Sequence, residues 1–165
     1  MDQTLPVRFD GEHAAMEVME RVIIAGDLSK LTAEERTRYY AAVCRSLSLN
    51  PMTQPFQYIT LNGKLTLYAR KDATDQLRKL HHVSVDIVGR ERIDDLYVVT
   101  ARATMPDGRH DEEIGAVCVA GLKGEALANA LMKAQSKSKR RVTLSLVGLG
   151  WLDESEVESI AGART

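Results

Sequence analysis

Apolar residues recur along this chain with two different periods, and each change of period marks a predicted element. The first apolar set recurs at mostly helical spacing over residues 13–24, which predicts a helix that Gly26 and Asp27 end. Residues 32–35 form a capping-box pattern, so a second helix should begin there and stop at Asn50-Pro51. We interpret this helical pair as a cover or an interface rather than a site.

From Phe56 onward the apolar period is two. Residues 56–61 and 64–68 alternate as strands do, and Asn62-Gly63 between them is a strong hairpin signal. A short helix is predicted next, over residues 71–81. Its inward residues should be Ala73, Leu77 and Leu80, and its outward residues Arg78 and Lys79.

Three further strands are predicted over residues 83–92, 96–105 and 109–119, with turns between them. A long basic helix follows from Leu122, and glycines at 148 and 150 break it. One stripe of this helix is small and apolar and can lie close on a sheet: Leu127, Leu131, Ala134 and Ser138. The predicted fold class is therefore α+β, an antiparallel β-meander with a long basic helix packed on it and an N-terminal helical pair.

The 165 residues are about one domain long and can bury their own core. We expect a flexible lead (1–11), N-terminal helices (12–50) that form one domain with a core (51–150), and an acidic tail (151–165) with a short capped helix.

Cys44 and Cys118 lie in apolar surroundings without metal-type spacing, which predicts reduced, buried thiols. No apolar run suits a membrane span or secretory leader, so we expect a soluble cytoplasmic protein.

Charge is informative through its distribution, because the formal net charge is only −1. Between residues 127 and 150 there is no carboxylate, so the bases of the long helix repel one another without relief from within that stretch. An external polyanion would supply that relief, which predicts a nucleic-acid contact. The predicted contact residues on this helix are Lys123, Lys133, Lys137, Lys139, Arg140 and Arg141.

A second basic patch lies earlier in the chain and is diluted by Asp72 and Asp75. Its candidate contact residues are Lys64, Arg70, Lys71 and Arg78. If the hairpin and short helix fold beside the long helix, the two patches would line one groove in which cations track phosphates. Aromatic residues are few and fall in strand patterns, so we expect core packing for them and a grip on the backbone alone.

The sequence contains no clear pattern of catalytic or metal-binding residues. The four histidines have no companions at metal-ligand spacing, and Asp111, Glu112 and Glu113 would alternate between the two faces of a strand. No phosphate loop, Ser-His-Asp set or Cys-His set is evident. We therefore expect a protein that is not an enzyme and that needs no cofactor.

Several motifs, in order, resemble the core of the Rad-fifty-two type single-strand annealing proteins, a superfamily that includes the phage recombinases of the RecT and Red-beta type. The motifs are a strand pair around Asp107-Gly108 with an acidic-Gly end at residues 111–115, Gly121-Leu122-Lys123 opening a helix, and the basic-apolar-Gly run 139–148. Residues 64–77 also resemble that family's strand followed by a short helix, and residues 49–56 resemble the N-terminal region of the phage recombinases.

The resemblance implies an oligomeric ring or helical filament that binds single-stranded DNA between the basic helix and the hairpin and anneals it without hydrolysing a nucleotide. Carried over by position, Lys123 and Arg141, with Arg140 beside it, would contact DNA. The chain departs where a hairpin base is expected, near Gln57 and Ile59, and where the second helix-end base falls on Val142.

As partners the resemblance implies single-stranded DNA, further copies of the chain, and a phage exonuclease or host single-strand-binding protein in a bacterial cell, the chain being of phage or prophage type. Three alternatives stay open at this point. They are a double-stranded RNA-binding module, a metal-dependent nuclease using Asp111, Glu112 or Glu113, and a non-enzymatic scaffold whose basic helix binds an acidic neighbour.

Overall fold

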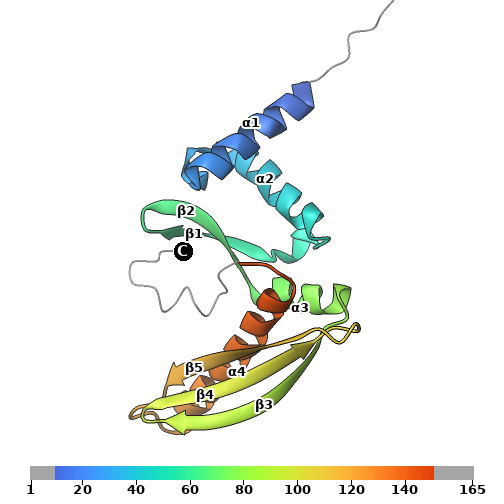
Figure 1. Ribbon diagram of the computed structural model, residues 1–165. Coiled ribbons are helices and arrows are strands. Elements are labelled where there is room, and N and C mark those ends of the chain that lie inside the picture. The colour runs from blue at the N-terminus through green and yellow to red at the C-terminus, as the bar shows by residue number, and fades with distance from the viewer. Residues whose placement is uncertain (1–9, 151–165) are drawn as a thin grey trace, which may run out of the picture.

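The computed structural model describes residues 10–150, with side chains from residue 16 onward, as four α-helices, two short 3-10 helices and five strands (Figure 1). The order is α1 (Asp10–Ala25), η1 (Leu28–Lys30), α2 (Ala33–Ser46), η2 (Pro51–Thr53), β1 (Phe56–Leu61), β2 (Lys64–Ala69), α3 (Lys71–Leu80), β3 (Ser84–Ile93), β4 (Leu96–Thr104), β5 (His110–Cys118) and α4 (Gly124–Leu146). This confirms the predicted α+β class and the predicted order of elements.

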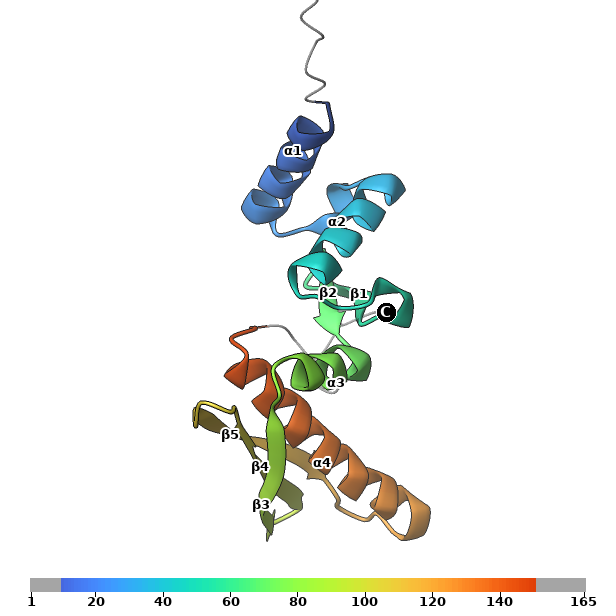
Figure 2. The same cartoon turned by 90° about the vertical axis from the view of Figure 1, so that its right-hand side faces the viewer.

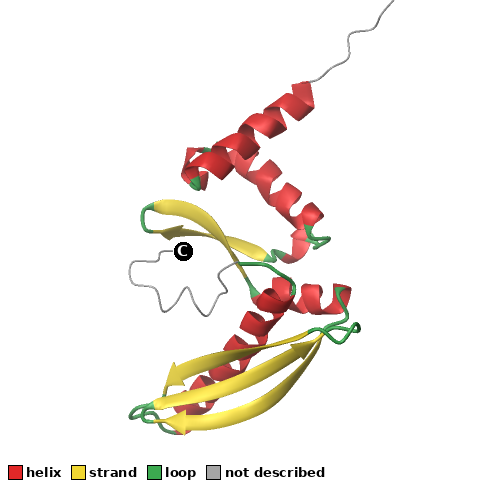
Figure 3. Cartoon of the chain, in the orientation of Figure 1, coloured by secondary structure: helices red, strands yellow, loops and turns green. Residues whose placement is uncertain are grey.

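Two antiparallel sheets divide the strands (Figure 3). The hairpin β1–β2 is a sheet of its own, and β3, β4 and β5 form a meander with β4 in the middle. The predicted meander with the long helix on it is thus confirmed. The hairpin, however, lies with α1 and α2 in a separate upper layer (Figure 1).

Local chemistry explains the elements that the sequence predicted best. The Thr32 hydroxyl accepts a hydrogen bond from the Glu35 N–H, and the Glu35 carboxylate accepts one from the Thr32 N–H, which is the complete capping box at the start of α2. Asn62 and Gly63 both have positive φ, 50° and 76°. A two-residue hairpin turn with this backbone matches the twist of the flanking strands.

Asp27 joins the helical pair to the hairpin. Its Oδ1 accepts hydrogen bonds from the Ser29 N–H at 3.0 Å and from the Leu65 N–H of β2 at 2.8 Å. The bonds from Ser29, followed by the bond from Leu65, lower the pKa of the Asp27 carboxyl to about 2. This one half-buried carboxylate therefore caps η1 and holds β2 against it.

Two groups of buried apolar residues meet at the end of α4. The upper group includes Leu28, Phe56 and Leu77 and receives Leu144 from α4. The lower group lies between the meander and the helix, where Ala101, Ala103 and Val142 are all fully buried. The last turns of α4 therefore fix the upper layer relative to the meander.

The helix α4 covers only one face of the meander (Figure 2). It crosses β5 at Gly115, where a Cβ atom would lie 2.2 Å from the Ala134 carbonyl oxygen and 2.5 Å from the Ser138 nitrogen. Ala134 and Ser138 are fully buried in this contact, as the small stripe predicted. Only glycine permits the helix backbone to approach the strand so closely.

Several predictions about individual residues are wrong. Asp10 and Gly11 belong to α1 rather than to a flexible lead, and α4 begins at Gly124 rather than Leu122. Leu80 is 43% exposed because it ends α3 beside an open groove. Cys118 is exposed because strand alternation puts it on the face of the meander opposite α4, whereas Cys44 is buried as expected and burial raises its pKa. The predictions for the first residues of the lead and for the acidic tail lie outside the described residues.

Replacing Gly115 with Ala should destabilise the protein by about 1–3 kcal/mol, because the new methyl group meets backbone atoms that cannot rotate away. Gly150→Ala is the matched control, since nothing lies within 4 Å of a Cβ built there and its cost should stay within about 0.5 kcal/mol. Urea unfolding of the two variants measures the difference. Equal midpoints would show that the close contact at Gly115 does not stabilise the fold.

Asp27→Asn should lower the thermal midpoint at neutral pH, because the amide loses the charge that strengthens its bonds from Ser29 and Leu65. The folded-state pKa of Asp27 is depressed, so its stabilisation is present above the unfolded-state pKa of about 4 and is lost as the pH falls toward 2. Thermal scans from pH 7 to pH 2 should show the two proteins converge below pH 4. A gap that stays constant would contradict this assignment.

Candidate nucleic-acid interface

The bases of α4 do not all point the same way. Lys123 is the N-cap residue of the helix and is exposed, as is Lys133. The remaining bases are half-buried: Lys137, Lys139, Arg140 and Arg141. Their surroundings are set by the two edges that α4 presents, one along β5 and one toward β3.

Along β5, the helix meets carboxylates. An Arg141 Nη2 atom lies 3.2 Å from Glu113 Oε2, and the Ser145 hydroxyl donates a hydrogen bond to Asp111. Lys137 lies over the same strand, with its Cβ close to Gly115. Asp111 and Glu113 share the helix side of β5, while Glu112 pairs with Arg102 on the other side at 2.5 Å, so the predicted alternation of these three acids is confirmed.

This arrangement corrects one premise of the sequence analysis. The bases of α4 do receive relief from within the protein, because Glu113 comes from a strand far away in the sequence. The carboxylate-free stretch of residues 127–150 is therefore not free of carboxylates in space. Arg141, one of the residues to which the family resemblance assigns a DNA contact, is the base whose charge is partly neutralised.

The other edge of α4 gains bases that sequence analysis missed. Arg90 of β3 donates a hydrogen bond from Nη2 to Gln135 of α4 at 3.4 Å, one helical turn before Lys139. Arg90 pairs with Val99 of β4, which pairs with Gly115, so Arg90 and, by alternation, Arg92 lie on the helix side of the sheet.

A β-bulge explains why no pattern predicted this. The register shifts between Ile87 and Gly89, so Val85 and Ile87 face the helix before the bulge and Arg90 and Arg92 face it afterwards. Strict alternation from Val85 would put both arginines on the opposite face of the sheet. The only sequence signal is Gly89 itself, inside an otherwise continuous strand pattern.

The second predicted patch is divided in space. Arg78, predicted to face outward, forms an ion pair with Asp75 and donates a hydrogen bond from Nη1 to the Thr143 hydroxyl of α4 at 3.4 Å, so it joins the long helix. Lys71 is exposed on the same stripe of α3, two turns earlier. Arg70 precedes α3 and donates to the Gln54 carbonyl at 3.4 Å.

Lys64 has a different position from the rest of that patch. It begins β2 at the hairpin turn, and its Nζ donates to the Ala25 carbonyl at the end of α1 at 3.2 Å. The hairpin meets α4 through Leu67 and Ala69, which share the upper apolar group with Leu144. Thus Arg78 contacts the long helix, while Lys64 contacts the end of α1.

Most of the described aromatic rings are packed in the upper layer. Phe56 and Tyr68 are buried and Tyr58 packs against the upper apolar group, as the strand patterns predicted. Tyr39 and Tyr40 pack there too, whereas Tyr97 of β4 is half-buried outside that group. The Tyr58 hydroxyl donates to the Arg36 carbonyl, and burial raises the pKa of Tyr58 to about 12. The Tyr40 hydroxyl donates to the Phe56 carbonyl. These rings stiffen the upper layer.

Val142, where the resemblance expects a base, is fully buried against Ala101 and Ala103. The position therefore belongs to the core between α4 and the meander. A basic side chain there would have to be buried without water, which is costly. The two bases that precede it, Arg140 and Arg141, are the ones near the surface.

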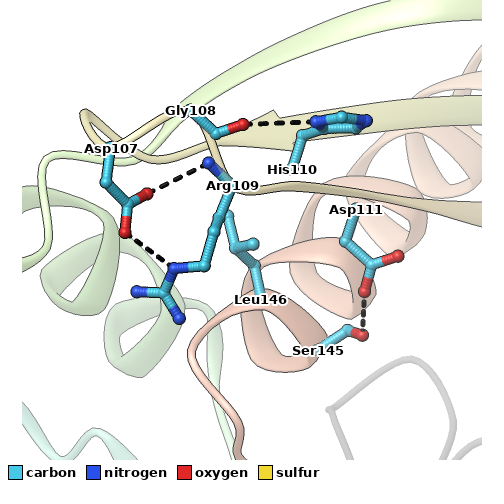
Figure 4. A pocket seen from close by; sticks show the side chains of 7 residues that line it. All are labelled: Asp107, Gly108, Arg109, His110, Asp111, Ser145 and Leu146. Atoms are coloured by element: carbon cyan, nitrogen blue, oxygen red, sulfur yellow. Dashed lines mark hydrogen bonds and ion pairs between the residues drawn. The ribbon is translucent and has the colours of Figure 1, made fainter.

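A shallow depression lies where the β4–β5 turn meets the end of α4 (Figure 4). Its charges satisfy one another: Arg109 Nε is 2.8 Å from Asp107 Oδ2, and the Arg109 N–H, followed by that side-chain bond, lowers the pKa of Asp107. Ser145 donates directly to Asp111, while the His110 ring turns away toward the Gly108 carbonyl. A catalytic triad needs the histidine between the other two, so this is a turn held by its own polar groups.

Residues 10–150 contain neither a metal-binding cluster nor a membrane-spanning helix. No group of three or more metal-binding side chains comes together in this part of the chain. None of its helices combines the length and the apolar character that spanning a membrane demands. His81 and His82 follow α3, and His110 begins β5.

Comparison with known proteins adds no relative. No protein-family model matches the sequence, and no curated protein matches it either.

The pair between Glu113 and Arg141 should be only weakly coupled, because their side chains keep 30% and 33% of their surface exposed. A double-mutant cycle with Glu113→Ala and Arg141→Ala, followed by urea unfolding, should give a coupling of about 0.2–1 kcal/mol. Arg141 would then be available to exchange Glu113 for another anion. A coupling well above this range would make Arg141 a structural residue.

Proposed function

We propose that this protein binds single-stranded DNA through its phosphates and anneals complementary strands, acting without ATP in homologous recombination. The observation that carries the proposal is the convergence of bases from three elements on α4. Lys139 and its neighbours lie on the helix, Arg90 reaches it from β3, and Arg78 reaches it from α3. The contact set is Lys123, Lys133, Lys137, Lys139, Arg140, Arg141, Arg70, Lys71 and Arg78, with Arg90 added.

The edge of α4 that faces β3 is the better track for a phosphate backbone. On the β5 edge, Glu113 and Asp111 repel an incoming polyanion and compete for Arg141. On the β3 edge, Arg90 donates to the neutral Gln135, and Arg78 is paired with Asp75 of its own helix. A strand following Arg90, Lys139 and Arg78 would release counterions at each step, which gives affinity without sequence preference.

Annealing also needs the bases of the bound strand to stay free for pairing. Rings that stack on bases hold a strand in storage, and the described rings of this protein are buried or half-buried. A grip on phosphates alone suits a protein that presents base edges to a second strand. Self-assembly into a ring or filament would extend this track, and an exonuclease or a single-strand-binding protein would be the natural suppliers of the DNA.

The direct test mixes the protein with two complementary labelled oligonucleotides, without ATP, and follows pairing by energy transfer at two salt concentrations. The proposal predicts acceleration over the spontaneous rate that weakens at high salt. Binding without acceleration, or a preference for duplex RNA over single-stranded DNA, would contradict the annealing function. Loss of full-length DNA on addition of magnesium would instead favour a nuclease.

Single arginine changes should test whether both edges of the helix contact the strand. Replacing Arg90 or Arg141 with Ala should weaken binding of a single strand by about 1 kcal/mol and lower the salt slope by about one, whatever the sequence. Arg38→Ala is the matched control, because Arg38 is exposed on α2 and pairs with Glu34. Titrations at several salt concentrations measure both quantities. If the control changes as much as Arg90→Ala, the site is not on this face.

Glu113→Gln should strengthen binding, since it removes a negative charge and releases Arg141 for a phosphate. The gain should shrink at high salt, because screening weakens the charge that was removed. The same titrations measure it. Unchanged or weaker binding would mean that Arg141 contacts no phosphate.

A further inference from the structure

The helix α1 carries apolar residues on two sides. Val18 is buried and Val22 is half-buried against the upper apolar group. On the other side of the helix, Met16, Met19 and Ile23 form a stripe at helical spacing whose members are 69%, 49% and 75% exposed. Figure 1 shows α1 projecting from the end of the molecule. Large apolar residues exposed together in this way mark an interaction surface.

An apolar groove lies on a different part of the same chain, where the ends of α2, α3 and α4 meet. It is a cavity of about 360 Å³ whose apolar lining is Leu47, Leu77, Leu80, Val147 and Leu149. Because a water molecule occupies only about 30 Å³ of liquid, whole side chains fit there. Leu80, which the sequence predicted to face inward, is partly exposed at its edge.

The charges beside the two surfaces are of opposite sign. Exposed Glu17 and Glu20 flank the stripe on α1. Exposed Arg45 and Lys79 directly adjoin Ser46 and Leu80 of the groove, and its described lining contains His81 but no carboxylate. Stripe and groove are thus both apolar, and the charges beside them are of opposite sign, as in partners of a specific contact.

We infer that the α1 stripe of one copy docks into the α2–α3–α4 groove of a second copy. The contact is heterologous, so each chain offers a stripe at one end and a groove at the other, and repetition gives a ring or a filament. Pairing of α1 with α1 is disfavoured, because it would bring the acidic flanks of both helices together. The open face of the meander is less suitable, since the Arg102–Glu112 ion pair lies across it.

These are the surfaces through which the proposed self-assembly would occur. The test uses DNA-free protein, so that its result does not depend on whether the protein anneals DNA. Light scattering on the full chain should find assemblies larger than two copies. Ile23→Asp, which disables the stripe, and Leu80→Asp, which disables the groove, should each give monomers with an unchanged circular dichroism spectrum. Ile114→Asp is the matched control, because Ile114 is also an exposed apolar residue, 52% exposed, on the open sheet face.

Mixing the two monomeric variants is the decisive step. Leu80→Asp keeps its stripe and Ile23→Asp keeps its groove, so the mixture should give dimers and nothing larger. A mixture that stays monomeric, a wild-type protein that is monomeric, or variants that keep the wild-type mass would overturn the inference. As a second variant that leaves the apolar residues intact, Glu17→Lys with Glu20→Lys should weaken assembly at least tenfold, and Arg45→Glu with Lys79→Glu in the partner should restore it.

Discussion

The close approach of α4 to β5 at Gly115 determines how the rest of the molecule is arranged. With the helix backbone against the strand, its small residues Ala134 and Ser138 are fully buried and its larger ones are turned to the two sides. Beyond this contact, the last turns of α4 reach the upper layer, where Leu144 joins the upper apolar group. The contact at Gly115 thus sets how α4 lies on the meander, and the end of α4 packs against the upper layer.

That packing also gives the helix two unlike edges. The β5 edge meets Glu113 and Asp111, while the β3 edge meets Arg90. The sequence suggested that the bases of α4 form one uniform cationic surface. In the structure the two edges of the helix differ, and the sheet favours the β3 edge for a polyanion. The proposed path of DNA follows from this asymmetry rather than from the number of bases on the helix.

Features that depend on residues close together in the sequence could be predicted from it. The capping box at Thr32, the Asn62-Gly63 turn and the period-two strands are local, and the structure has all of them. Features that depend on distant partners could not. The pair between Glu113 and Arg141, the bulge that turns Arg90 toward the helix, and the separation of the hairpin from the meander depend on how the elements meet in space. These same features shape the candidate site.

The central claim is that the protein holds a nucleic-acid strand by its phosphates and leaves the bases free. The most direct test compares binding of a single-stranded oligonucleotide with binding of an abasic strand of the same length over a range of salt concentrations. The account predicts equal affinities and equal salt slopes, because both strands carry the same phosphates. A much weaker complex with the abasic strand would contradict it, since the bases would then be part of the grip.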